Sequence, residues 1–335
     1  MATYSTEKGF TIQSLASDPS PLLEGQVWYN TTTAVLKGAT WTTGTGTWAS
    51  GGTLNATHLG NAFGIGTQTA GIVAGGYQEP PTIDIKLCET YDGTSWSAGN
   101  DINTGRCQGA SGGTTGAGLI FGGIKTQSSW TIGYADTEEY NGTSWSNVNS
   151  LTAAMAATAY GCNGTQTAAM KAGSRSPPPA PSGTCSTYDG TSWSDINELN
   201  TGGSGAGAGN STAAVDMGRD GGPVPLGKAI CELYDGTCWS EQSNMNTPRE
   251  GNPGAGSSTL ALVIGGYGNN QAVEQWNGTT FTTVNSLANA YQYSAAAGTG
   301  TLALSMAGNV STAHITTSEE WTQPTPVAAK TFTAT

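Results

Sequence analysis

The sequence predicts an all-β protein, a six-bladed β-propeller in which an N-terminal strand closes the last blade. An aromatic–turn–aromatic motif recurs at steps of 42 to 49 residues, a period typical of propeller blades. Each repeat also holds an apolar strand ending in small residues, and the two ends of the chain hold complementary halves of a repeat. The motif begins at Tyr91, Tyr140, Tyr188, Tyr234 and, in a looser copy, Trp276.

Each motif is predicted to be a tight β-hairpin. The first copy reads Tyr91-Asp92-Gly93-Thr94-Ser95-Trp96, and the later copies keep Asp-Gly or Asn-Gly in the same place. These pairs tolerate positive φ at both central positions, as a type I′ turn requires. The flanking aromatic residues then lie on paired strands, from which they can pack between neighbouring sheets.

An apolar strand precedes each hairpin and predicts the inner part of each blade. Small residues follow it, as in the Gly-Gly doublets of residues 75–76, 122–123 and 265–266. Small side chains suit strands that crowd together around a propeller axis. The six copies cover residues 72–76, 119–123, 170–173, 215–218, 262–266 and 304–308.

The two ends of the repeat region predict how the ring closes. Trp48 stands 48 residues before Trp96 but lacks the preceding strand, whereas Trp321 follows such a strand and lacks the turn after it. The strand around Trp48 is therefore expected to pair with the strand of Trp321. This closure would remove two unpaired sheet edges.

Composition limits the classes of partner. The chain has 335 residues, 11 of them Lys or Arg, and a formal net charge of −12. A strongly acidic chain without a basic tract is a poor match for nucleic acid or an anionic membrane. No apolar run predicts a membrane helix, and residues 1–10 do not resemble a signal peptide. The six cysteines contain no Cys-x-x-Cys pair, and we expect no metal and no cofactor.

Three segments are expected. Residues 1–40 form an N-terminal arm with a hairpin around residues 25–38, residues 41–322 form the propeller, and residues 323–335 form a C-terminal tail. An arm with one hairpin buries little core by itself. Trp28 and Tyr29 in the hairpin are therefore our candidate assembly contacts.

The repeat resembles the kelch family of propellers. The Gly-Gly doublet, the Glu-x-Tyr strand, the small turn, the Trp and an Arg ten residues later (Arg106, Arg249) match its pattern over residues 41 to about 322. The doublet is intact in three repeats and the Arg appears in two. The resemblance implies four-stranded blades with N-terminal closure. It implies no function, because kelch propellers serve many functions.

Residues 24–37 resemble a short module of tailed-bacteriophage virion structural proteins. The segment reads Glu-Gly-Gln-Val-Trp-Tyr-Asn-Thr-Thr followed by Val-Leu-Lys, and covers about a tenth of the chain. The resemblance implies a component of a tail, a fibre or a capsid surface, located on the virion.

The recurring polar residues favour structural roles. A Glu lies two residues before the repeat aromatic at positions 89, 138, 232, 274 and 319. Such a Glu is expected to pair with Arg or backbone N–H groups between blades. His58 and His314 are the only histidines and make a poor metal site without clustered carboxylates.

The long connections that follow the apolar strands share one phase of the repeat, so they should emerge on one face. They are rich in aromatic residues and Pro, which suit binding to sugars or proteins. An alternative is that these loops vary only because nothing opposes them. The candidate binding residues on this face are Tyr77, Trp130, Tyr134, Arg175, Pro178 and Arg219.

The leading hypothesis is a non-enzymatic phage structural protein. Its expected partners are other virion proteins, a homo-oligomer of the chain itself, and a neighbouring subunit or a host-surface glycan at the loop-rich face. One alternative is a carbohydrate-active enzyme or an oxidase, which would need clustered His, Tyr, Cys or carboxylates at the axis. A third is an intracellular adaptor.

Overall fold

A computed structural model describes most of the chain as strands joined by turns and loops. It describes residues 12–20, 26–41, 45–56, 60–78, 83–125, 133–155, 164–174, 181–220, 227–268, 270–310, 313–324 and 327–332. The chain forms two compact units. The larger is Thr47–Thr322, and the smaller combines Met1–Gly46 with Gln323–Thr335.

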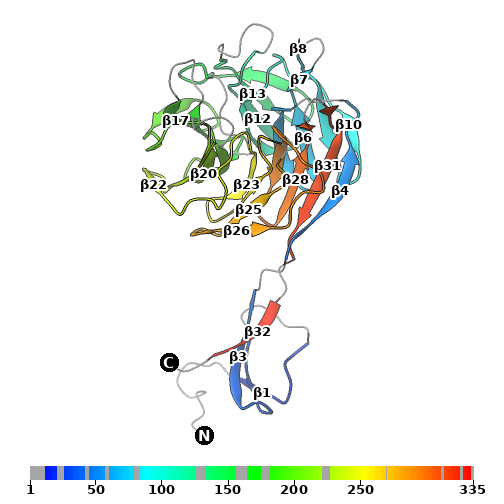
Figure 1. Cartoon of the computed structure of the whole chain (residues 1–335), viewed down its shortest axis with the longest axis vertical. Coiled ribbons are helices and arrows are strands. Elements are labelled where there is room, and N and C mark those ends of the chain that lie inside the picture. Colours follow the sequence, from blue (N-terminus) through cyan, green and yellow to red (C-terminus); the bar gives the residue numbers. More distant parts are fainter. Residues whose placement is uncertain are drawn as a thin grey trace. The chain divides into compact units, whose positions relative to one another are not determined.

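The larger unit is a β-propeller of four-stranded antiparallel sheets (Figure 1). Within its described residues there are six such sheets, and each takes one repeat of the sequence. In chain order the first three are β5 (Phe63–Thr67), β6 (Ala70–Ala74), β9 (Cys88–Tyr91) and β10 (Trp96–Ala98); β11 (Ala110–Thr114), β12 (Ala117–Phe121), β13 (Thr137–Tyr140) and β14 (Trp145–Val148); and β15 (Gly164–Thr165), β16 (Ala168–Ser174), β17 (Ser182–Tyr188) and β18 (Trp193–Ile196).

The other three sheets complete the ring. They are β19 (Ala206–Asn210), β20 (Ala213–Arg219), β21 (Lys228–Tyr234) and β22 (Trp239–Glu241); β23 (Gly254–Ser257), β24 (Leu260–Ile264), β25 (Val273–Trp276) and β26 (Phe281–Val284); and β27 (Ala295–Gly298), β28 (Leu302–Met306), β31 (Thr317–Thr322) and β4 (Thr47–Thr53). The inner strands contact one another in the order β5, β11, β15, β19, β23, β27 and back to β5. We refer to the sheets as blades 1 to 6 in this order.

The predicted closure is confirmed. Strand β4 pairs antiparallel with β31, and Trp48 lies directly opposite Trp321. Their ring centroids are 5.4 Å apart, and the Trp321 side chain is fully buried. Two segments more than 260 residues apart in sequence therefore share one blade.

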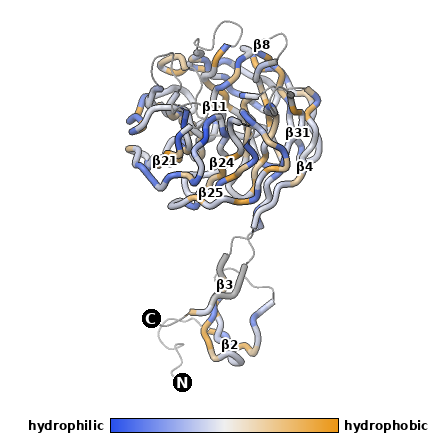
Figure 2. The backbone as a smooth tube through the Cα atoms, in the orientation of Figure 1, coloured by the Kyte–Doolittle hydropathy of each residue, from blue (hydrophilic) through white to orange (hydrophobic). Residues whose placement is uncertain are grey.

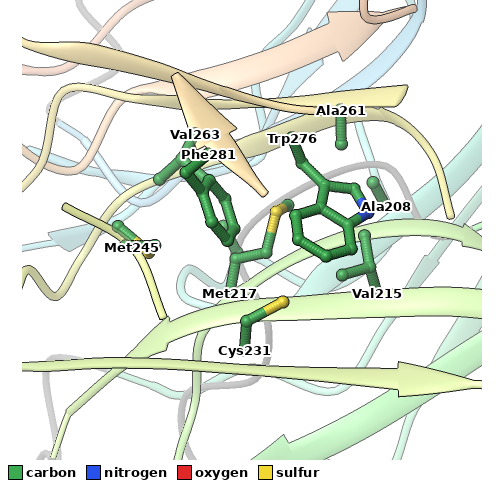
Figure 3. Packing of buried hydrophobic residues seen from close by; sticks show 10 residues of the cluster. Ala208, Val215, Met217, Cys231, Met245, Ala261, Val263, Trp276 and Phe281 are labelled. Carbon is green, nitrogen blue, oxygen red and sulfur yellow. The ribbon is translucent and has the colours of Figure 1, made fainter. Parts of the chain in front are cut away.

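The aromatic residues of each hairpin pack against the preceding blade, as predicted. Tyr91 and Trp96 stack with ring centroids 4.9 Å apart and share a buried cluster with Ala297 and Leu304 of blade 6. Trp276 and Phe281 of blade 5 pack in the same way on Met217 of blade 4 (Figure 3). The second strands of the blades, such as β6 and β24, are apolar and buried on both faces, and Figure 2 shows hydrophobic and hydrophilic stretches within the propeller.

The turn type predicted for the hairpins is wrong. In the first hairpin φ is positive at Gly93 (+90°) but not at Asp92, and the Asp92 N–H donates to the Ser95 carbonyl. The turn is therefore centred one residue later than a type I′ turn on Asp-Gly. The Asp92 carboxylate accepts hydrogen bonds from the Thr94 and Ser95 N–H groups, so Asp here acts as a side-chain acceptor instead of a residue with positive φ.

The smaller unit is a separate sheet of four strands in the order β1 (Gln13–Leu15), β2 (Val27–Asn30), β3 (Val35–Trp41) and β32 (Val327–Thr331). The predicted hairpin is present as β2 and β3. The expectation that residues 323–335 form a separate tail is wrong, because β32 pairs antiparallel with β3. The propeller boundary lies at residue 47 instead of 41.

Asp18 holds the smaller unit together. Its carboxylate accepts hydrogen bonds from the Trp28 indole at 3.2 Å, the Asn30 amide at 3.0 Å and the Lys37 ammonium at 2.9 Å. These donors, Lys37 foremost, hold the pKa of Asp18 below its usual range. Trp28 is fully buried and Tyr29 is half-buried. Trp28 therefore belongs to the core of this unit, which corrects its assignment as an assembly contact.

The boundaries predict which fragments fold. A chain of residues 47–322 should unfold cooperatively, because it keeps all four strands of every blade. A chain of residues 54–322 lacks β4 and uncovers Trp321, and should lose at least about 3 kcal/mol of unfolding free energy relative to fragment 47–322. Urea denaturation followed by tryptophan fluorescence measures both. Equal stability of the two fragments would contradict the closure.

Candidate functional site

Long connections between the second and third strands of the blades emerge at one end of the propeller. In blade 1 the connection contains the hairpin of β7 (Tyr77–Gln78) and β8 (Ile83–Asp84), and in blade 6 that of β29 (Asn309–Val310) and β30 (Ala313–His314). The label β8 marks this end at the upper edge of the propeller in Figure 1. Because the second strand has the same place in every blade, the remaining long connections share this end.

A cleft of about 360 Å³ opens between the connections of blades 1 and 2. The blade 1 connection contributes Asp84 and Lys86, and the blade 2 connection contributes Lys125 and Tyr134. The segment that leads from blade 1 to blade 2 supplies Asn103, Thr104 and Gly105. A Cβ on Gly105 would lie 2.8 Å from the Asp84 carbonyl oxygen, so the close approach of these two segments requires glycine.

Hydrogen bonds fix the walls of the cleft. The exposed Lys86 ammonium donates to the Asn103 carbonyl oxygen at 2.6 Å. The Tyr134 N–H donates to the Gly123 carbonyl, and the Tyr134 carbonyl accepts from the Met155 N–H. Burial, with smaller contributions from Asp84 and Asp136, raises the pKa of the Tyr134 phenol. This phenol is therefore a neutral hydrogen-bonding group at physiological pH.

A buried ion pair supports the floor of the cleft. The Glu138 carboxylate accepts hydrogen bonds from the N–H groups of Asn103 and Thr104 and from the Arg106 guanidinium. The side chains of Arg106 and Glu138 are both fully buried, with 2.7 Å between the nitrogen and oxygen atoms. The polar groups that face the cleft are thus held by a rigid base.

The cleft gathers basic charge in an acidic chain. Seven basic residues are described in the propeller, and four of them, Arg106, Lys171, Arg219 and Arg249, are buried. Two of the remaining three, Lys86 and Lys125, line this cleft. The third, Lys228, begins β21 in blade 4. The cleft therefore offers ammonium donors, a phenol and amide groups to a polar ligand with negative charge.

The predicted binding residues are only partly brought together. Tyr134 lines the cleft, whereas Tyr77 is half-buried and packs on Cys107 and Ile124. Trp130, Arg175 and Pro178 lie outside the described residues.

The assignment of Arg219 to the binding face is wrong, because its side chain is fully buried. Its guanidinium donates to the carboxylates of Asp216 and Glu232 and to the Thr201 carbonyl.

The structural role predicted for the repeated glutamates is confirmed. All five are buried, and each accepts hydrogen bonds from two consecutive N–H groups of the segment that arrives from the preceding blade. Arg106 pairs with Glu138 and Arg249 with Glu274. Arg219, from the end of β20, pairs with Glu232.

The described residues contain no group of three or more His, Cys, Asp and Glu side chains that could hold a metal ion. His58 lies outside the described residues, and the His314 side chain is not described. Across the part of the chain that is described, no helix is long and apolar enough to cross a bilayer.

Comparison with solved structures supports the fold. The structure of YjhT is similar to this chain with a TM-score of 0.62 over 83% of this chain and 99% of YjhT, at 13% sequence identity. At this identity the similarity shows the β-propeller fold alone. The sequence matches no family model and no curated protein.

Sequence reasoning identified Tyr134 and missed the other six residues of the cleft, including its three charged side chains, Asp84, Lys86 and Lys125. A usable signal was present, because two of only 11 basic residues lie in the long connections of adjacent repeats. The missing information was that blade order brings these connections together.

Breaking the ion pair under the cleft should destabilise the propeller. Glu138→Gln leaves the Arg106 charge buried without its carboxylate, and should lower the unfolding free energy by about 3–5 kcal/mol. Glu198→Gln, at an exposed position, is the control and should change it by less than about 0.5 kcal/mol. Chemical denaturation measures both, and similar values for the two variants would contradict the structural role.

Asp216 should make stability depend on pH. Burial raises its pKa to about 6, although Arg219 opposes the shift. The folded state then holds this proton more tightly than the unfolded chain, so the contribution of Asp216 is fully present below about pH 4 and is lost as the pH rises through about 6. Relative to wild type, Asp216→Asn should gain on the order of 1–3 kcal/mol between pH 4 and pH 8.

Denaturation curves of Asp216→Asn, of wild type and of the surface variant Asp101→Asn across this pH range provide the measurement. A constant difference between Asp216→Asn and wild type at all pH values would show that Asp216 does not titrate in this window.

Proposed function

We propose that the chain is a non-enzymatic structural protein of a tailed-bacteriophage particle, and that the cleft between blades 1 and 2 contacts an acidic glycan on the host surface. The observation that carries the glycan contact is the pairing of Lys86 and Lys125 with Tyr134 in one cleft. Carboxylated or sulfated sugars present negative charge together with hydroxyl groups and an apolar ring face. Ammonium, amide and phenol groups match these features.

The net charge of −12 does not oppose this contact at short range. At physiological ionic strength the Debye length is about 8 Å, so charges elsewhere on the surface are screened while groups inside the cleft are not. Lys86, Lys125 and the Asp84 carboxylate would therefore set the local charge of the cleft, which is positive by one. A neutral glycan would gain only the hydrogen bonds.

One resemblance and one surface feature support the assignment to a phage particle. The segment of residues 24–37 is similar to a module of phage virion proteins, and its described residues 27–37 lie in the hairpin of the smaller unit. That unit leaves Ile12, Val27 and Phe332 exposed, and exposed apolar side chains are suited to a contact with another particle protein. We assign particle anchoring to this unit and glycan contact to the propeller.

The kelch-like pattern has a physical explanation in this chain. In the first doublet Gly75 and Gly76 have φ of +63° and +102°, and a Cβ on Gly75 would lie 2.6 Å from the Arg106 carbonyl oxygen. The Arg of the pattern forms the buried pair with Glu. Both features connect adjacent blades, which supports a kelch-type propeller and leaves the loop-rich end free to carry the function.

The cleft predicts a charge-dependent affinity. The double variant Lys86→Glu/Lys125→Glu should lower affinity for an acidic polysaccharide at least about tenfold, because two attractive charges become repulsive. Lys228→Glu makes a single charge reversal of the same kind in another blade and should leave affinity within about twofold. Binding to immobilised uronic-acid-containing and sialylated polysaccharides, compared with neutral ones, measures the effect. Absence of binding to all of them, or equal loss in both variants, would refute the glycan contact.

Particle location is tested separately. Purified particles should contain the full chain at an external position by immunogold electron microscopy, and should fail to incorporate the propeller of residues 47–322 alone. Normal incorporation of that fragment would refute the anchoring role of the smaller unit.

A further inference from the structure

Five of the six blades use the same device to attach to their neighbour. A Glu on the third strand receives the backbone N–H groups of two consecutive residues from the incoming segment, with nitrogen–oxygen distances of 2.7–3.2 Å. The segment presents these N–H groups at 55–56, 103–104, 200–201, 246–247 and 288–289. An ionised carboxylate suits this place because it accepts both hydrogen bonds at once.

Blade 3 lacks the carboxylate. Ser186 occupies the position and lies opposite Lys171 of β16. The incoming segment follows the same path in blade 3 as in the other blades. Its Leu151 N–H donates to the Ala135 carbonyl, and the equivalent bonds run from the Ile102 N–H to the Lys86 carbonyl for the segment that enters blade 2 and from the Leu199 N–H to the Gly183 carbonyl for the segment that enters blade 4.

The next two residues of that segment, Thr152 and Ala153, therefore hold the places of the N–H donors in the other blades. Within the described part of the chain, neither backbone N–H group has a protein acceptor.

A cavity of about 70 Å³ lies where the missing side chain would be. Lys171, Ser186, Thr152 and Ala153 are among the residues that line it. Met155 also lines it, at the position in the segment where Arg106 and Arg249 stand in other blades. The glutamate and its arginine are thus absent together, and a buried lysine occurs in their place.

Lys171 has a buried ammonium without a carboxylate partner. The residue is 3% exposed, and its ammonium donates to the carbonyl and the hydroxyl of Thr184. No described carboxylate oxygen lies within 4.0 Å of it. Burial lowers the pKa of Lys171 to about 8, while Cys185, Asp195 and Glu198 act in the opposite direction. A buried cation of this kind is stabilised by an anion that reaches it.

Asp195 also lines the cavity but does not replace the missing glutamate. It is exposed, and its carboxylate accepts hydrogen bonds from the hydroxyls of Thr152 at 2.7 Å and Ser186 at 2.8 Å. Its negative charge opposes an anion in the cavity, so we expect a ligand with no more than a single negative charge. The N–H groups of Thr152 and Ala153 are not used by it.

We propose that the blade 3 cavity binds a small monocarboxylate, of the size of formate or acetate, where the other five blades hold their glutamate side chain. The ligand carboxylate accepts hydrogen bonds from the Thr152 and Ala153 N–H groups, and its charge is balanced by Lys171. Four heavy atoms support only modest affinity, so the dissociation constant lies in the millimolar range. The site is independent of the glycan cleft.

The test is a titration of the full-length protein with sodium acetate at constant ionic strength, with sodium chloride as the reference. In nitrogen–proton NMR spectra the Thr152 and Ala153 amide signals should shift along a saturable curve. The melting temperature should rise by about 3 °C at ten times the dissociation constant. Amide signals that do not respond beyond the chloride reference overturn the proposal.

Two variants give the matched comparison. Ser186→Glu restores the carboxylate covalently, so it should melt about 3 °C above wild type without acetate and lose the acetate response. Ser194→Glu adds the same side chain at an exposed position of β18 and should keep the response. A folded Ser186→Glu protein that still responds as wild type does would overturn the assignment. If Ser186→Glu does not fold, Lys171→Met provides the test. This variant should abolish the acetate response, and a wild-type response would overturn the proposal.

Discussion

The propeller depends on one contact that is repeated around the ring: the aromatic pair of each blade packs on the inner strands of the blade before it. Tyr140 and Trp145 pack on Ile65 and Ile72 of blade 1 in the same way as Trp276 packs on Met217 of blade 4. A single four-stranded sheet cannot bury both of its faces. Each blade is therefore stable only with two neighbours, and the first blade requires the last one.

This dependence explains why the sequence predicted the fold and its closure. A contact used in every repeat leaves the same residues at the same spacing, so the period, the hairpins and the pairing of Trp48 with Trp321 could be read without coordinates. Features that occur only once in the chain could not be predicted in this way. The pairing of β32 with β3 and the role of Asp18 join segments with no internal copy. The turn type was missed because the Asp side chain, and not its φ angle, shapes the turn.

The candidate site was predictable to a smaller extent for the same reason. The repeat phase placed the long connections at one end, which brought Tyr134 into consideration, but it gives no information about which exposed side chains converge between blades. For Arg219 the error was the opposite one: a buried residue was assigned to the surface. It follows an apolar strand and precedes a loop, so it reads as a surface residue, yet it replaces the arginine that blades 2 and 5 take from the incoming segment. The ion pair between Arg219 and Glu232 joins two residues that are 13 positions apart within one blade, so it leaves no signal in the repeat pattern of the sequence.

Repetition also makes each departure from the pattern informative. A ring of similar interfaces distributes stability among six contacts, so one interface can lack the buried glutamate while the other five hold the ring. In blade 3 the loss is coordinated, because Ser186, Met155 and Lys171 differ from the pattern together around one cavity. Simple decay of the arginine position leaves the glutamate in place, as in blade 6, where Tyr291 stands at that position and Glu319 is still buried. A lysine placed in an otherwise apolar strand adds a desolvation cost that decay does not explain. An anion that reaches Lys171 from solution offsets that cost, and it also gives the N–H groups of Thr152 and Ala153 the acceptor that their counterparts have in every other blade.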